Sequence, residues 1–308
     1  MVDTFLALTP VFLLIAVGWA LKATWLREDD AWRAIERLAY YVAIPALVIH
    51  DLYQADLGTL PFARMAVALV GAILIVAAAL VVLRPVLSRI LVGGDLGFTS
   101  VFQGSVRANF FIILGAAPAL LPADGAALVI VAVAFFTVTV NILSVLVLAR
   151  WGTQGETNLG ALIKRLLTNP FIVATALGIA INLANPPIPP VADATLAMVA
   201  GAGVPLALLT AGSGLRLATI GVHLPGILIA SLFRLVATPA IALALGLLLG
   251  LEASVLAMLV LFHSQPTSTS SYVLARQMGG DHELMAGILT TQTLLAIITI
   301  PAMLALFA

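Results

Sequence analysis

Long apolar runs alternate with short polar or Pro/Gly-rich breaks along the whole chain. A helix needs about 20 mostly apolar residues to cross a hydrocarbon core of about 30 Å. Ten runs approach this length, at roughly 4–22, 34–53, 62–83, 98–121, 126–149, 169–184, 191–214, 225–250, 253–276 and 284–307. The pattern predicts an all-α integral membrane protein with ten transmembrane helices.

Composition narrows the class of protein further. Of the 308 residues, 62% are hydrophobic and 9% are charged, whereas soluble domains carry about 25% charged residues. The 14 Lys and Arg balance the 14 Asp and Glu, so no basic excess indicates nucleic acid as a partner. The absence of cysteine excludes disulfides and Cys-based metal sites. The first ten residues lack the features of a cleaved signal, so we expect the first run to remain as a span.

The Lys and Arg residues gather in alternate connections between the runs. Eleven lie in the odd-numbered connections, whereas the two termini and the even-numbered connections carry only Arg64. Positive residues are retained on the cytoplasmic side of a membrane. We therefore expect a multi-pass protein of the cell membrane, the inner membrane in a bacterium, with both termini on the non-cytoplasmic side.

The two halves of the chain are related by an offset of 160 residues. Without a gap, the offset superposes Pro10 on Pro170, Gly18 on Gly178, Pro45 on Pro205 and Phe102 on Phe262. We expect one five-helix repeat in residues 1–150 and a second in 151–308, which the odd number of crossings would invert. Inverted repeats are typical of secondary transporters, in which they permit alternating access.

Polar residues interrupt the fourth and ninth runs, which the offset makes counterparts. The fourth contains Gln103, Gly104, Ser105, Arg107 and Asn109, and the ninth contains His263, Ser264, Gln265, Pro266 and five consecutive Ser/Thr residues. Backbone groups freed by a broken helix are tolerated within a membrane only where protein or a wet cavity satisfies them. We expect both helices to be interrupted and to meet near the bilayer midplane. Further breaks or kinks are expected at Gly115, Pro118, Pro45 and Pro205.

These two segments are the candidate substrate site. The N-termini of half-helices present positive dipole ends to an anion, and Arg107 adds a full charge. We expect a small organic anion to bind there, with Asn109, Gln265, Thr267 and Ser268 as hydrogen-bond donors. His263, Asn141 and Gln292 are candidates for completing the cavity or for coupling.

Structural interpretations compete with these roles. Arg107 can instead reach the cytoplasmic interface, and Ser270 and Ser271 are expected to make contacts between helices. His263 is equally consistent with a packed polar residue and with a proton-sensitive group. Arg234, about ten residues into the eighth run, is expected to mark the cytoplasmic end of that helix.

Other functional classes are disfavoured by what the sequence lacks. No carboxylate lies in the middle of a predicted helix, which argues against a carrier with a buried acidic pair for sodium or protons. Backbone carbonyls and hydroxyls are still able to bind sodium, so coupling to protons or sodium stays open. The chain has no phosphate loop, HExxH motif or nucleophile elbow. We expect no enzyme activity, no metal and no cofactor, and a channel is disfavoured because a fixed pore does not explain paired broken helices.

Four longer segments carry a resemblance to a known family. They are TNPFIVATALGIAIN (168–182), GVPLALLTAGSGL (203–215), RANFFIILGAAP (107–118) and the block from Gln265-Pro266 through GGDHELMAGILTTQTLLAIITIP. In order and spacing they resemble the auxin efflux carriers, and the short central connection resembles the bacterial, malonate-permease-like branch. The resemblance implies a scaffold of helices 1, 2, 6 and 7, and a moving domain of helices 3–5 and 8–10. It also implies that helices 4 and 9 cross at the substrate, with Asn109 and Pro266 at the crossover, and that transport is of the elevator type.

Two alternatives share this architecture. One is a sodium-dependent organic anion symporter of the bile-acid type, and the other is a membrane receptor that binds a ligand without transporting it. Related scaffolds often pair through their static domains, so a homodimer is expected by analogy.

Overall fold

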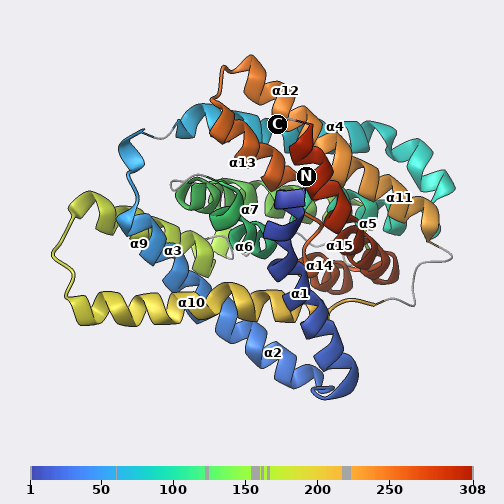
Figure 1. Cartoon of the computed structure of the whole chain (residues 1–308). Helices are drawn as coiled ribbons and strands as arrows, with labels where there is room; N and C mark the ends of the chain where they lie inside the picture. The colour runs from blue at the N-terminus through green and yellow to red at the C-terminus, as the bar shows by residue number, and fades with distance from the viewer. Residues whose placement is uncertain are drawn as a thin grey trace.

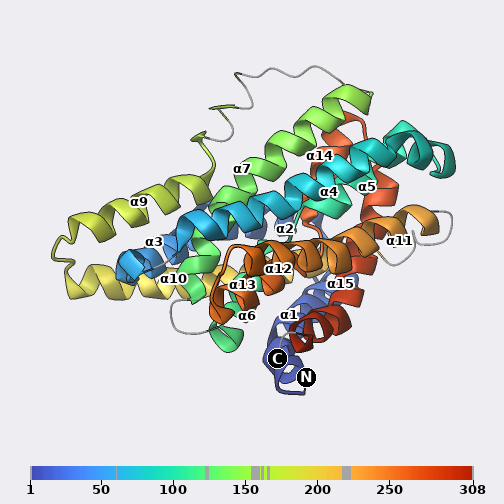
Figure 2. The same cartoon turned by 90° about the horizontal axis from the view of Figure 1, so that it is seen from above.

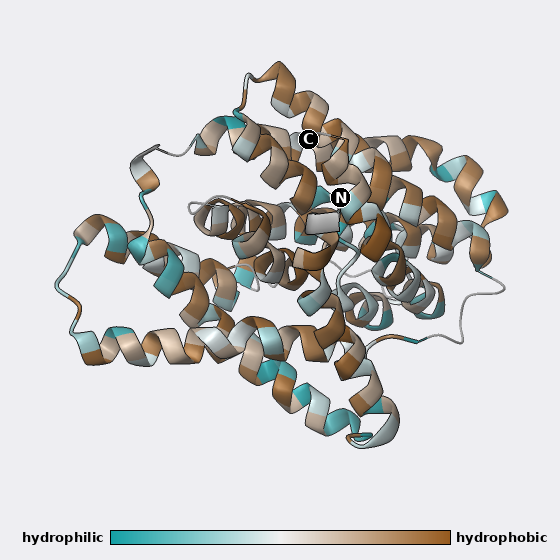
Figure 3. Ribbon diagram, in the orientation of Figure 1, coloured by the Kyte–Doolittle hydropathy of each residue, from teal (hydrophilic) through white to brown (hydrophobic). Residues whose placement is uncertain are grey.

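Every regular element in the described part of the chain is a helix. The computed structural model describes residues 2–59, 61–121, 125–153, 160, 163–164, 167–216 and 223–306. Six of the described helices are long and apolar enough to cross a membrane, namely Thr4–Thr24, Phe62–Ile90, Gly125–Trp151, Pro190–Ser213, Leu224–Leu248 and His282–Ala305. Apolar residues cover most of the ribbon, while hydrophilic ones gather on α2 and near helix ends (Figure 3). The described residues are all-helical, as predicted, and these six long apolar helices are consistent with an integral membrane protein.

The first group of helices lies in the lower and left part of Figure 1. It consists of α1 (Val2–Thr24), α2 (Asp29–Leu38), the π-helix η1 (Ala39–Ala43), α3 (Ile44–Gln54), α9 (Pro170–Ala184) and α10 (Pro190–Ser213). Helix α10 packs on both α1 and α3, and α3 packs on α9. These elements correspond to the first, second, sixth and seventh apolar runs.

The second group contains the remaining long helices and packs beside the first (Figures 1 and 2). Its members are α4 (Phe62–Ile90), α5 (Asp95–Val106), α6 (Phe110–Leu120), α7 (Gly125–Trp151), α11 (Leu224–Leu232), the π-helix η4 (Phe233–Ala237), α12 (Thr238–Leu248), α13 (Ala253–His263), α14 (Thr269–Met278) and α15 (His282–Ala305). A short 3-10 turn, η2 (Leu57–Thr59), precedes α4. Helix α4 packs on α5, α7 and α12, and α15 packs on α5, α11 and α14. The two groups meet along α6, which contacts α1 and α10.

Several residues expected to break helices do not interrupt them. Helix α6 continues through Gly115 and Pro118, and α10 continues through Pro205. Pro45 stands in the first turn of α3, directly after the π-helix η1, where a missing N–H is least costly. A break at Gly115, Pro118 or Pro205 is therefore wrong, and a bend at these positions stays a prediction.

A reciprocal pair of glycines brings α1 and α10 into backbone contact. A Cβ atom on Gly18 would lie 2.0 Å from the carbonyl oxygen of Leu209, and one on Gly212 would lie 1.9 Å from the carbonyl oxygen of Ile15. Small residues permit this close approach, and it provides much of the attraction between helices in lipid. The first group is thus held together by a backbone contact that leaves no space for a larger side chain at Gly18 or Gly212.

This contact predicts that Gly→Ala substitutions at two positions of α10 differ strongly in their effect on stability. We expect Gly212→Ala to destabilise the protein by about 1–3 kcal/mol, because its methyl group would overlap the α1 backbone. The matched control is Gly201→Ala, since nothing lies within 4 Å of a Cβ atom at Gly201. Thermal unfolding of both variants in detergent checks this, and equal midpoints would contradict it.

Candidate functional site

The fourth apolar run is broken into two helices at residues 107–109. Helix α5 ends at Val106, and Arg107 follows it with extended backbone angles. Asn109 then caps α6, because its side-chain oxygen accepts a hydrogen bond of 3.1 Å from the Phe111 N–H. Asn is among the residues that satisfy the free amides at a helix start most effectively. The second half-helix therefore begins inside the apolar run with its N-terminus already ordered.

The ninth apolar run is broken at residues 264–268. Helix α13 ends at His263, and α14 begins at Thr269 after the cap residue Ser268, whose hydroxyl accepts from the Ser270 N–H at 3.3 Å. The two cap residues, Asn109 and Ser268, lie within one residue of the 160-residue offset seen in the sequence. Both interruptions thus lie within the polar segments that predicted them.

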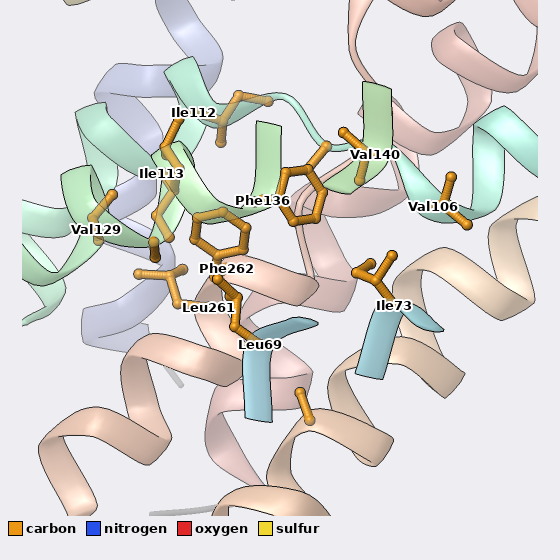
Figure 4. Close-up of a cluster of buried hydrophobic side chains, with 14 of the residues drawn as sticks. Leu69, Ile73, Val106, Ile112, Ile113, Val129, Phe136, Val140, Leu261 and Phe262 are labelled. Carbon is orange, nitrogen blue, oxygen red and sulfur yellow. The ribbon is translucent and has the colours of Figure 1, made fainter. Parts of the chain in front are cut away.

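The two breaks are in direct contact. The backbone N–H of Asn109 donates to the carbonyl oxygen of Pro266 at 2.7 Å. This bond joins the start of one half-helix to the freed backbone of the other. Figure 4 shows the apolar side chains of Ile112, Phe136, Leu261 and Phe262, from α6, α7 and α13, in one buried cluster. Asn109 and residues 264–268 are buried as well, so the backbone groups of the two breaks depend on partners in the protein.

Gln292 of α15 joins the two breaks a second time. Its Oε1 accepts from the Thr267 N–H at 2.8 Å, and its Nε2 donates to the Gly104 carbonyl at 3.0 Å. The side chain is fully buried. The sequence placed Gln292 among residues that complete a cavity, whereas the structure gives its polar atoms to the backbone of both broken helices.

Arg107 projects from the first break toward polar side chains of α7 and α14. One terminal nitrogen, Nη1, donates to Asn141 Oδ1 at 2.9 Å and to Ser144 Oγ at 3.5 Å, and the other, Nη2, donates to Ser270 Oγ at 2.9 Å. Arg107 retains 8% exposure, beside the exposed Ser270. Asn141, which the sequence offered only as a candidate for completing the cavity or for coupling, thus lies beside Arg107, together with Ser144, which the sequence analysis had not singled out.

The hydroxyls after the second break bond to one another. Thr267 Oγ1 lies 3.1 Å from Ser271 Oγ, and Ser268 Oγ lies 2.9 Å from Ser270 Oγ. The run of Ser and Thr therefore forms local hydrogen bonds within and just before α14. Only Ser270 among them also reaches Arg107 in the hydrogen bonds described here.

Gln265 and His263 point elsewhere in the second break. Gln265 Nε2 donates to the Leu261 carbonyl at 2.7 Å, and its Oε1 has no hydrogen-bond partner within the described residues. His263 is fully buried against the rings of Phe136 and Phe262. Neither of its ring nitrogens makes a hydrogen bond of normal geometry in the described chain, although the Leu69 backbone lies near the ring.

The structure corrects the expectation for Arg234. The eighth run forms a continuous helical path from α11 through η4 to α12, so Arg234 lies within the span rather than at its cytoplasmic end. Its side chain is fully buried and donates to backbone carbonyls of the ninth run. A charged side chain inside a membrane span is a candidate functional residue by default, so Arg234 joins Arg107 as a buried cation beside the breaks.

A cavity of about 230 Å³ lies between the two groups of helices. It is lined by Leu47, Asp51, Leu114, Gly115, Ala117, Pro118, Ala126, Ala200, Gly201 and Val204. Gly115 and Pro118, expected as kink residues, thus border open space along α6. Elsewhere along the boundary between the two groups, Phe110 of α6 contacts Phe171 of α9, with ring centroids 5.4 Å apart. Tyr40 of η1 lies within electrostatic range of Arg107.

The role of Gln292 predicts a large effect of a conservative substitution. Gln292→Leu keeps the shape but leaves the Thr267 N–H and the Gly104 carbonyl without partners, at a cost of about 1–3 kcal/mol for each. We expect a clearly lower thermal midpoint in detergent. Thr293→Val is the control, because the Thr293 hydroxyl donates only within its own helix. If both variants unfold at the wild-type temperature, Gln292 does not join the breaks.

Nearly the whole chain matches one protein family. The family model described as "Membrane transport protein" aligns with residues 3–304, which include both breaks. No curated protein sequence matches the chain at a significant level. Since the match spans both groups of helices, it applies to the complete fold described here and not to one segment. The chain belongs to this membrane transport protein family, that of the auxin efflux carriers, and is a multi-pass membrane transporter.

Proposed function

We propose that the protein is a secondary transporter of a small organic anion, a carboxylate, which binds where the two broken helices meet. The observation that carries this proposal is the set of Arg107 partners. Its three hydrogen bonds go to the neutral side chains of Asn141, Ser144 and Ser270. In the described part of the chain no carboxylate forms an ion pair with Arg107.

A buried positive charge without a negative partner is costly in a membrane. The Nε atom of Arg107 also lacks a hydrogen-bond partner among the described residues. A guanidinium pairs with a carboxylate through two parallel, charge-assisted hydrogen bonds. A bound carboxylate would therefore supply both the missing charge and the missing acceptor, and the neutral partners would hold the guanidinium in place for it.

The half-helices add to this preference for an anion. The N-terminus of α6 begins at Asn109 and that of α14 at Ser268, and Arg107 contacts the second of these regions through Ser270. The N-terminus of a helix carries about half a positive charge. Two such ends and one guanidinium favour negative charge in the same region. In this proposal the other candidate residues do not face Arg107. They shape the second break, and they are His263, Gln265, Pro266, Thr267 and Gln292.

We further propose an elevator-type movement of the second group of helices against the first. The first group, a static scaffold, is fixed by the glycine contact between α1 and α10. At Gly115 the boundary beside α6 consists of contacts with the apolar side chains of Val204 and Val11, which form no hydrogen bonds that a movement would have to break. The matched break positions support two inverted five-helix repeats, 1–150 and 151–308, as the basis of alternating access. A homodimer through the scaffold is part of the same proposal.

Transport by the purified protein tests the substrate site. A thermal-shift screen against dicarboxylates, indole acids and bile acids selects a ligand, and its uptake into liposomes is then measured. We expect Arg107→Ala and Asn109→Ala to reduce uptake by about tenfold or more, since each loses a charge-assisted contact or a helix cap. Gln277→Ala, an exposed amide on α14, is the control. Unchanged uptake of every carboxylate by both variants would place the site elsewhere. A strict sodium requirement would favour the bile-acid-type symporter, and binding without uptake would favour a receptor.

The proposed movement makes a separate prediction at Gly115. A Cβ atom there would lie 3.0 Å from Val204 and 3.2 Å from Val11, so Gly115→Val would wedge α6 against α1 and α10. We expect this variant to keep its ligand-induced thermal shift while uptake falls by about tenfold or more. Gly201→Val, in the open part of the same boundary, serves as the control. Normal uptake by Gly115→Val would show that α6 does not slide along this contact.

A further inference from the structure

Arg234 makes its hydrogen bonds at the end of α13, on the carbonyl groups freed by the second break. Its Nε donates to the Gln265 carbonyl at 2.7 Å, and its Nη2 donates to the Phe262 carbonyl at 3.2 Å. The residue is fully buried, in the middle of the path from α11 to α12. These are contacts between the eighth and ninth runs, 28 and 31 residues apart in the chain.

The Phe262 carbonyl needs a donor from another helix, because the residue that would normally bond to it is a proline. In an uninterrupted helix it would accept from the N–H four residues later, but that residue is Pro266, which has no N–H. The Gln265 carbonyl lies beyond the last turn of α13 and has no helical partner either. Arg234 therefore gives the second break the hydrogen bonds that its own backbone cannot make.

The positive charge of Arg234 lies at the negative, C-terminal end of α13. The C-terminus of a helix carries about half a negative charge, and the Arg234 guanidinium lies at that end of α13 with the Phe136 ring 5.7 Å away. Among the described residues Arg234 has no carboxylate partner, and its Nη1 makes no hydrogen bond. Freed carbonyls at the C-terminal ends of broken membrane helices are the groups that bind coupling cations in secondary transporters.

We propose that Arg234 is a positioning residue that acts as a built-in cation for the second break. Its guanidinium occupies the cluster of carbonyls where a sodium ion would otherwise bind. It fixes the second break, and hence the Pro266 carbonyl that accepts from Asn109, without a dissociable metal ion. This proposal rests on the proposed function in one respect, that the breaks carry the substrate site.

The π-helix η4 is the local device that places Arg234 there. A π turn adds one residue to a helix and shifts the side chains that follow, and such turns are frequent at functional sites. The backbone N–H of Thr238 bonds to the Phe233 carbonyl five residues earlier, as in a π turn, and Thr238 Oγ1 donates to the same carbonyl at 2.6 Å. The next residue, Pro239, has no N–H with which to continue the π pattern into α12.

Two substitutions separate a cation from a neutral hydrogen-bond donor. Arg234→Lys keeps the charge, whereas Arg234→Gln keeps donors and loses the charge. Because the positive charge at the C-terminal end of α13 is kept only by Lys, we expect uptake by the Lys variant to stay within about threefold of wild type and uptake by the Gln variant to fall by about tenfold or more. Arg89→Ala, which removes an exposed arginine at the end of α4, is expected to behave as wild type. Equal uptake by the Lys and Gln variants would overturn the proposal.

Chemical rescue gives a readout that a merely structural role would not produce. We expect non-denaturing, millimolar guanidinium to restore part of the uptake and of the thermal midpoint of Arg234→Ala, and to leave Arg89→Ala unchanged. Lost uptake without any rescue of either quantity would overturn the proposal. Where Arg234→Ala does not accumulate, the comparison of Lys and Gln variants decides.

The wild-type protein supplies the last part of the test. We expect uptake in sodium and in choline buffers to agree within about twofold, because the break already holds its cation. A sodium requirement would overturn the proposal. If the wild type transports no organic anion in either buffer, the proposed function fails, but the thermal midpoints, measured without substrate, still decide the role of Arg234.

Discussion

The backbone hydrogen bond from Asn109 to the Pro266 carbonyl is the constraint on which the other features of the site depend. Within hydrocarbon every backbone polar group needs a partner in the protein. Two broken helices expose such groups in pairs, and here each break supplies what the other lacks. Gln292 bridges the Thr267 N–H and the Gly104 carbonyl in the same way. Neither break is expected to be stable alone, so the site exists only when the two halves of the chain have packed together.

The sequence predicted the features that follow from local chemistry. Apolar runs indicated the membrane helices, and the polar residues beside Arg107 and Pro266 indicated the two interruptions. The sequence did not predict where Arg234 and Gln292 send their hydrogen bonds, because their partners are backbone atoms of other helices and carry no residue signal. The π-helix that contains Arg234 was not predicted either, and a charge about ten residues into the eighth apolar run was interpreted as the cytoplasmic end of that helix. Gly115 and Pro118 were expected to break or kink α6, but the helix continues through both residues where it packs on α1 and α10.

Glycine has opposite consequences in the two kinds of helix contact. Gly18 and Gly212 place the backbones of α1 and α10 against each other, which fixes their register since carbonyl groups fill the space of any side chain. Gly115 instead faces the ends of two valine side chains. A contact between smooth apolar surfaces has no directional bonds to break when it shifts. The same residue type therefore brings two backbones into contact between α1 and α10, and leaves only apolar side-chain contacts at the boundary of the proposed movement.

The two buried arginines differ in how far their hydrogen-bond partners offset their positive charge. Arg234 is fully buried and gives hydrogen bonds to two carbonyls at the negative end of a helix, which offsets part of its charge. Arg107 gives its bonds to an amide and two hydroxyls, which orient the guanidinium without offsetting its charge. At the proposed site, an anion would therefore meet the field of Arg107, while Arg234 would hold the backbone of the second break. If Arg234 is the built-in cation that we propose, no cation has to be recruited to fix this break, and the attraction for the anion does not depend on a second solute.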